Sequence, residues 1–239
     1  AAALAGLKVE RLVNEPSAAA VAGHIAEGDV DKVCLVFDFG GGTLDVSLVE
    51  RFDNVISVTA VSGDNRLGGQ DFDSAIARGF CEDCGVDFDA LEPRQREMIL
   101  RQAETCKMAL TQQDMVIMAV DDGTLSASLT LNNEWLIRKG GPLFKRMTDP
   151  IQRVFLDAGV SPAEMDDLVM VGGSSHMPVV RRYSSRFLRK EPVKDSRPDT
   201  AVAIGGGVCA GMKARAWYLR EVVLADVFPF TLGVARYNE

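Results

Sequence analysis

Three glycines and a threonine interrupt an apolar run, with an aspartate on each side. The segment reads VFDFGGGTLDVS, residues 36–47. Glycine lets the backbone approach a ligand closely and adopt dihedrals that a side chain would forbid, and successive N–H groups in such a turn attract anions. The Thr43 hydroxyl can add a hydrogen bond. The pattern favours a phosphate-binding turn at Gly40, Gly41, Gly42 and Thr43, and the alternative is an ordinary hairpin with a glycine-rich turn.

The flanking aspartates, Asp38 and Asp45, have the same sign of charge as a phosphate and cannot bind one directly. They make sense if a hard cation with its water molecules lies between them and the phosphates. The residues therefore predict a clamp for a magnesium nucleotide, in which Asp38 holds the magnesium ion through water.

Composition limits the class of protein. The 239 residues suffice for one large domain or two small ones, and 47% apolar with 25% charged residues is ordinary for a globular α/β protein. A net charge of −8 argues against a nucleic-acid partner. No apolar run approaches the roughly 18 residues that span a bilayer, so we expect no membrane partner.

The five cysteines are odd in number and scattered, which predicts reduced thiols and a cytoplasmic protein. Cys81 and Cys84 have CxxC spacing, but neither a second such pair nor a nearby histidine completes a zinc site. We interpret this pair as part of a packed helix.

Apolar periodicity predicts alternating strands and helices. Strands are expected at residues 8–13, 33–39, 44–51, 54–61 and 168–171, with a hairpin at 116–120 and 125–131. Helices are expected at residues 15–22, 71–84, 92–110, 142–158, 177–188 and 200–218. Three consecutive glycines at 205–207 lie within the last helix, and each destabilises a helix by about 1 kcal/mol relative to alanine. Glycines at this cost indicate that the helix backbone packs closely against a ligand or against another helix.

This order of elements predicts two subdomains. One is discontinuous and comprises residues 1–67 and 141–220, and the other is an inserted α+β subdomain at 68–140. Residues 221–239 form a separate tail.

Four motifs in this order resemble successive signatures of the seventy-kilodalton heat-shock chaperones, the DnaK family. They are NEPSAAA at 14–20, DFGGGTLDVS at 38–47, GDNRLGGQDFD at 63–73 and VGGSSHMP at 171–178. The tail, VVLADVFPFTLGV at 222–234, resembles the interdomain linker and first peptide-domain strand of that family, in a form closer to its HscC-type branch.

The resemblance implies an actin-like ATPase fold, of the ribonuclease-H-like kind, with this chain as the second lobe of the nucleotide-binding domain. The first lobe, with its catalytic lysine, and the peptide-binding domain are expected outside this chain. The implied cofactors are ATP or ADP and magnesium. The implied partners are these two missing parts, a J-domain cochaperone, a nucleotide exchange factor and unfolded peptides, in protein folding and the stress response.

The resemblance also implies roles around the glycine turn. Gly40 to Thr43 would face the β- and γ-phosphates, Asp38 would hold magnesium waters, and Asp45 would orient the attacking water. Glu15 would link the nucleotide state to the linker. The alternative for Glu15 is a solvated carboxylate in the first turn of a helix, where the helix dipole favours it.

A second set of residues resembles the adenosine site. Gly172, Gly173 and Ser174 resemble the adenosine loop, and a tight strand-to-helix connection is the alternative. His176 stands where the family commonly has an arginine, and an exposed residue at a helix start is the alternative. Asp199 matches an aspartate near the loop, and a helix cap is the alternative.

A third set lies in the inserted subdomain. Glu104, Lys107 and Thr111 match residues that contact adenosine, and their spacing of three and four places them on one helical face. A solvated salt-bridge face is the alternative. Met108 replaces an arginine that some members place beside the adenine, and Gln70 replaces a common glutamate.

These observations lead to three competing hypotheses. The first is the ATP-binding lobe of a DnaK-type chaperone, in whose parent nucleotide binding and hydrolysis control peptide binding; the lobe alone is expected to have negligible turnover. The second is a fragment of an actin-fold small-molecule kinase, and the third is a non-enzymatic module that binds cochaperones. The apolar tail at 222–230 is expected to be mobile or to dock onto a neighbouring molecule.

Overall fold

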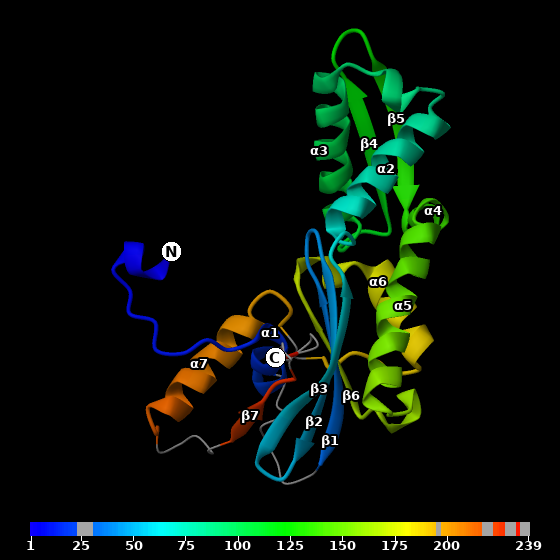
Figure 1. Ribbon diagram of the computed structural model, residues 1–239. Helices are drawn as coiled ribbons and strands as arrows, with labels where there is room; N and C mark the ends of the chain where they lie inside the picture. Colours follow the sequence, from blue (N-terminus) through cyan, green and yellow to red (C-terminus); the bar gives the residue numbers. More distant parts are fainter. Residues whose placement is uncertain (23–30, 195–196, 217–221, 228–232, 235–239) are drawn as a thin grey trace, which may run out of the picture.

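The computed structural model describes residues 1–22, 31–194, 197–216, 222–227 and 233–234 (Figure 1). A five-stranded sheet in the order β6-β1-β2-β3-β7 occupies its lower part. These strands are β1 (Lys32–Phe39), β2 (Leu44–Phe52), β3 (Val55–Asp64), β6 (Asp167–Val171) and β7 (Val223–Ala225).

The sheet is mixed. Strands β1, β2 and β3 form an antiparallel meander, whereas β6 runs parallel to β1 and β7 runs parallel to β3. Strand β1 is almost continuously apolar because both faces of the sheet are covered. Its Leu35 and Phe37 enter one core, and Cys34 and Val36 enter the other.

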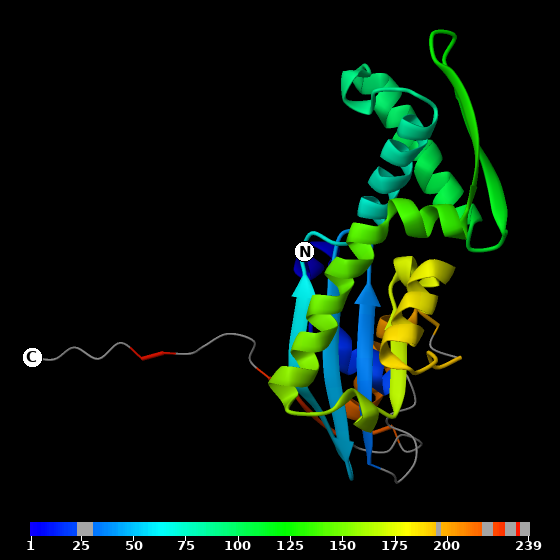
Figure 2. The ribbon, with the colours of Figure 1, turned by 90° about the vertical axis from the view of Figure 1, so that its right-hand side faces the viewer.

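Helices cover both faces of this sheet. On one side lie α5 (Gly141–Ala158) and α6 (Pro178–Leu188), and on the other lie α1 (Glu15–Ala20) and α7 (Ala201–Lys213) (Figures 1 and 2). Helix α5 ends at Gly159, which has a φ of 68° and so takes the left-handed conformation that glycine tolerates at a helix end.

The crossing of α1 and α7 depends on Gly205. A Cβ atom at this position would lie 1.8 Å from the carbonyl oxygen of Ala18 in α1, whereas Gly206 and Gly207 have nothing within 4 Å. Of the two interpretations of this glycine run, a tight helix crossing therefore holds for Gly205. Helix α7 ends at Lys213, before the predicted end, and residues 217–218 of that prediction lie outside the described residues.

A second unit of helices and a hairpin stands above the sheet in Figure 1. It contains α2 (Gly69–Asp83), α3 (Pro93–Ala109), β4 (Met115–Asp121), β5 (Ser126–Asn132) and α4 (Asn133–Lys139). The predicted hairpin is confirmed, since β4 and β5 pair antiparallel. Asn132 caps α4, because its Oδ1 accepts a hydrogen bond of 2.8 Å from the N–H of Trp135. The subdomain limits at residues 68 and 140 stay a prediction.

The strand predicted at residues 8–13 is wrong. The structure gives these residues no helix or strand, and the Leu12 side chain is 88% exposed. A strand needs a neighbour for its backbone N–H and C=O groups. No strand of the described residues pairs with this segment.

The expectation of a mobile tail is also wrong where the structure describes it. Strand β7 packs on its own chain, because Val223 pairs with Val55 and Ala225 with Ser57. The Val223 N–H donates to the carbonyl of Asn54 at 2.8 Å. Without β7, β3 would be an edge strand with unpaired backbone groups, which is a template for a further strand.

Cys81 lies buried in α2, which agrees with the packing interpretation of the CxxC pair. Every cysteine is free, and burial raises the pKa of Cys81 and of Cys84. Within the described ranges, no helix combines the length and the apolar character needed to cross a membrane.

Candidate functional site

The glycine turn connects β1 to β2 as the tip of a hairpin. Asp38 pairs with Asp45 across the two strands, and the Gly40 N–H donates to the Thr43 carbonyl at 3.0 Å. Gly41 is exposed, as is Gly42, and a Cβ on either would meet nothing within 4 Å. Among the described residues, the N–H groups of these two glycines donate to no protein acceptor. The turn therefore has the free N–H donors that an anion needs.

The start of α2 fixes the other side of the turn. The Gly69 N–H donates to the Gly40 carbonyl at 3.0 Å, and the Gln70 N–H donates to the Gly41 carbonyl at 2.8 Å. Gly68 packs so closely that a Cβ there would lie 2.4 Å from the Gly42 nitrogen. The inserted unit thus holds the turn directly through backbone contacts.

Three carboxylates gather next to this turn. Glu15, at the start of α1, joins Asp38 and Asp45 in the wall of a pocket of about 380 Å³. Burial, together with the negative charges of Glu15 and Asp45, raises the pKa of Asp38 to about 6. Glu15 is also exposed in the first turn of α1, as the solvated alternative describes, so its role at the site stays a prediction.

The structure adds Asp226 to this pocket, which sequence reasoning missed. Asp226 follows β7 directly, and the Ser17 hydroxyl donates to its carboxylate. The resemblance predicts that the tail is part of a linker to another domain, which gives no reason to expect Asp226 at the site. The strand-like pattern before it was the available signal.

We expect Asp38→Asn to raise the free energy of unfolding at pH 7.5 by about 1–2 kcal/mol, a value reduced for the partial exposure of the carboxylate. The folded-state pKa of Asp38, about 6, lies above the ordinary value of 3.8. The folded chain therefore binds the additional proton between these values, and stability falls as pH rises through this window. Asparagine removes that loss.

Urea denaturation in metal-free buffer at pH 7.5 and pH 4 measures this effect. The gain should be present at pH 7.5 and should vanish at pH 4, where the carboxyl is neutral in the folded chain. An equal gain at both pH values would contradict the electrostatic explanation.

The loop that resembles an adenosine site begins where β6 ends. Gly172 has a φ of 83°, and a Cβ there would lie 2.5 Å from the Phe39 carbonyl oxygen. Glycine at position 172 therefore allows a close connection between the strand and the turn. At Gly173 there is more space, since the atom nearest to a Cβ position there is Asp199 Oδ1, at 4.0 Å. The Ser174 hydroxyl donates to the Gly40 carbonyl at 2.8 Å, which ties this loop to the phosphate turn.

His176 and Asp199 lie together. The Nε2 atom of His176 is 2.9 Å from Oδ2 of Asp199, and both side chains are exposed. The N-cap residue of α7 is Thr200 and not Asp199. The Thr200 side chain itself makes no capping hydrogen bond. The capping alternative for Asp199 is therefore wrong.

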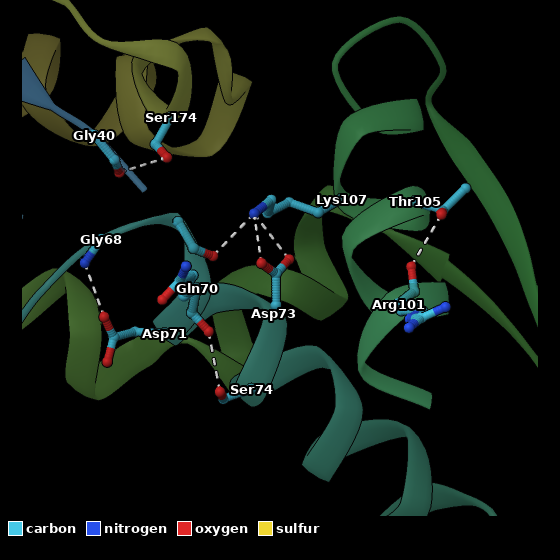
Figure 3. A network of polar contacts seen from close by, with 11 residues as sticks. Gly40, Gly68, Gln70, Asp71, Asp73, Ser74, Arg101, Thr105, Lys107 and Ser174 are labelled. Atoms are coloured by element: carbon cyan, nitrogen blue, oxygen red, sulfur yellow. Dashed lines mark hydrogen bonds and ion pairs between the residues drawn. The ribbon is translucent and has the colours of Figure 1, made fainter. Parts of the chain in front are cut away.

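Lys107 is held inside the protein (Figure 3). Its Nζ donates to the Gly69 carbonyl at 2.9 Å and to Oδ2 of Asp73 at 2.8 Å, and both side chains are nearly buried. Burial raises the pKa of Asp73, while the Lys107 ammonium opposes that rise. A solvated salt-bridge face does not describe this lysine.

The other predicted residues of this face differ. Glu104 is exposed on α3, while Thr111 lies beyond its end and donates to the Met108 carbonyl at 2.7 Å. Met108 is 63% exposed.

Glycine at position 69 brings these groups into one network. A Cβ at Gly69 would lie 2.3 Å from Ser174 Oγ and 3.1 Å from Lys107 Nζ. Figure 3 shows Lys107 directed toward the start of α2, with Ser174 next to Gly40 beyond it. The glycine turn, the loop after β6 and the start of α2 therefore meet at this point.

Comparison with known proteins identifies the family. The model of the Hsp70 protein family matches residues 1–239. The chain belongs to the Hsp70 family. The actin-like α/β fold implied by the sequence motifs is thus confirmed, whereas the HscC-type branch stays a prediction.

Among Hsp70 relatives is the chaperone protein DnaK of Deinococcus proteolyticus, which is 37% identical over 242 aligned positions. The alignment covers 97% of this chain and 38% of that relative. This Hsp70 chain therefore spans well under half the length of the curated relative that it matches.

Proposed function

We propose that this chain is a nucleotide-binding lobe of an ATP-dependent chaperone, which binds ATP or ADP together with magnesium. One observation carries the proposal. The N–H groups of Gly41 and Gly42 donate to no acceptor among the described residues, and the strands that this turn connects bring Asp38 and Asp45 into one pocket with Glu15. Backbone N–H groups bind a phosphate group, and clustered carboxylates bind a cation or its water molecules. The two together therefore suit a phosphate group with a cation better than a phosphate or a cation alone.

The residues present fit such a group. Within the described residues, no three His, Cys, Asp or Glu side chains are placed to hold a metal ion together. A magnesium ion here would be held through its own water molecules, with Asp38 as their partner and Glu15 nearby. When bound, magnesium neutralises phosphate charge during phosphoryl transfer. Asp45, exposed on β2, is the residue that we propose orients the attacking water.

The adenosine would lie on the other side of the turn. Gly173 offers bare backbone beside Asp199, which contacts His176, and Glu104 is exposed on α3. We assign Ser174, Lys107 and Gly172 mainly to positioning, because each is engaged with the turn or with the start of α2.

The longer parent protein would couple this lobe to peptide binding. Strand β7 lies on the sheet, and Asp226 beside it enters the same pocket as Asp38. A change at the nucleotide can therefore reach the tail directly. We propose that the remaining lobe and a peptide-binding domain complete the parent, and that a J-domain cochaperone, a nucleotide exchange factor and unfolded peptides are its partners in the cytoplasm.

We expect the chain alone to hydrolyse ATP negligibly, because it holds one side of the proposed site. A phosphate-release assay on purified protein with magnesium and ATP measures this. Asp45→Asn is the control that separates true turnover from a contaminating ATPase. Steady hydrolysis that Asp45→Asn abolishes would contradict the expectation.

A second candidate is a non-enzymatic module that binds cochaperones. It is favoured by the pairing of Lys107 with Asp73, which engages this ammonium group, and by the exposed Met108, which carries no charge. This candidate predicts no nucleotide binding by the chain, which titration with magnesium and ADP tests.

A further inference from the structure

A second pocket, of about 500 Å³, lies between α4, α5 and α6. None of the residues assigned to the nucleotide site lines it. Its volume falls within the roughly 300–1,000 Å³ of small-molecule sites. The pocket and its possible ligand are therefore independent of the proposed nucleotide function.

Three aromatic rings form one wall. The centroids of Phe144 and Tyr183 lie 5.2 Å apart with the rings tilted by 37°, and Tyr183 and Phe187 lie 6.4 Å apart with an angle of 6° between the rings. Phe187 is 38% exposed, so this nearly parallel pair ends at the surface. A flat aromatic ring can continue such an arrangement by offset stacking.

Two arginines stand at the same pocket. Arg182 and Arg186 are both exposed, and one helical turn separates them on α6. Neither has a carboxylate partner among the described residues, and the pocket lining contains no Asp or Glu. Like charges at this spacing repel each other, so an anion between them relieves that repulsion. Guanidinium groups also bind carboxylate and sulfonate-like oxyanions by paired hydrogen bonds.

We propose that this pocket binds a small planar aromatic anion. The ring would stack on Tyr183 and Phe187, and its carboxylate or sulfonate would lie between Arg182 and Arg186. Ile137 from α4 and Phe144 from α5 form the apolar side of the pocket. The combination of stacked rings and unpaired guanidiniums selects this ligand class over a neutral aromatic compound.

The probe for this site is 8-anilinonaphthalene-1-sulfonate, titrated into the full chain and followed by fluorescence. The double variant Arg182→Gln/Arg186→Gln should weaken its binding about tenfold, which is about 1.4 kcal/mol. The matched control, Arg181→Gln/Arg189→Gln, removes the same charge from the same segment outside the pocket lining and should change binding less than about twofold.

N-phenyl-1-naphthylamine, the same ring system without the sulfonate, separates charge from stacking. It should bind the wild-type chain and both variants with equal affinity. Equal weakening of the sulfonate probe by both double variants would overturn the proposal, since it would indicate only a general charge effect. Competitive displacement of the probe by Mg-ADP would also overturn it, because the pocket would then belong to the nucleotide site.

Discussion

Replacing Gly205 with alanine is expected to lower the free energy of unfolding by about 3 kcal/mol. The new Cβ would lie 1.8 Å from the Ala18 carbonyl oxygen, and its next neighbour, the Ala18 carbonyl carbon, would lie 2.4 Å away. Both atoms belong to backbone, so no side chain can turn aside. Helix α7 must move away from α1, and the core formed by Ala19, Ala20 and Cys209 loses its packing.

Gly206→Ala is the matched control for this experiment. It lies one position further along α7 and has nothing within 4 Å of its Cβ position. Alanine there should raise the free energy of unfolding by up to about 1 kcal/mol through helix propensity. Urea denaturation of both variants measures the difference, and similar changes in the two would contradict the crossing described here.

Gly68→Ala is expected to weaken Mg-ADP binding by more than about tenfold, or about 1.4 kcal/mol. Its Cβ would lie 2.4 Å from the Gly42 nitrogen and 2.5 Å from the Gly41 carbonyl group. The turn would have to shift, and with it the N–H groups proposed to bind phosphate. Calorimetric titration measures the loss.

The control for Gly68→Ala is Gly141→Ala, at the start of α5, where a Cβ meets nothing within 4 Å. Its Mg-ADP binding should equal that of the wild-type chain. Unchanged binding in Gly68→Ala would show that the turn does not hold the phosphates.

Local patterns in the sequence sufficed for most of the fold. The apolar run of β1 and the alternation of the hairpin strands β4 and β5 are short-range signals, and these strands lie close to their predicted limits, whereas α7 ends at Lys213 and not at residue 218. The errors fall where a partner distant in sequence decides the outcome. Among the described residues, no strand pairs with residues 8–13. Strand β7 pairs with β3, although most of the chain separates the two strands in sequence.

The same division applies to the site. The motifs predict a phosphate-binding turn at Gly40 to Thr43, and the structure brings Glu15, Asp38 and Asp45 together in one pocket. Sequence spacing could not show that Lys107 is bound to Asp73, 34 positions away. Nor could it show that Ser174 binds the carbonyl of Gly40, because that contact joins residues 134 positions apart.

The most direct test of a nucleotide half-site is to follow the amide NMR resonances of this chain during titration with magnesium and ADP. We expect saturable shifts at Gly41, Gly42 and Thr43, with no change at Gly123, the exposed glycine between β4 and β5. Adenosine without phosphate should leave the turn resonances in place. Absence of any shift at the turn with Mg-ADP in the millimolar range, on the order of a 4 kcal/mol interaction, would contradict the nucleotide site and favour the cochaperone-binding module.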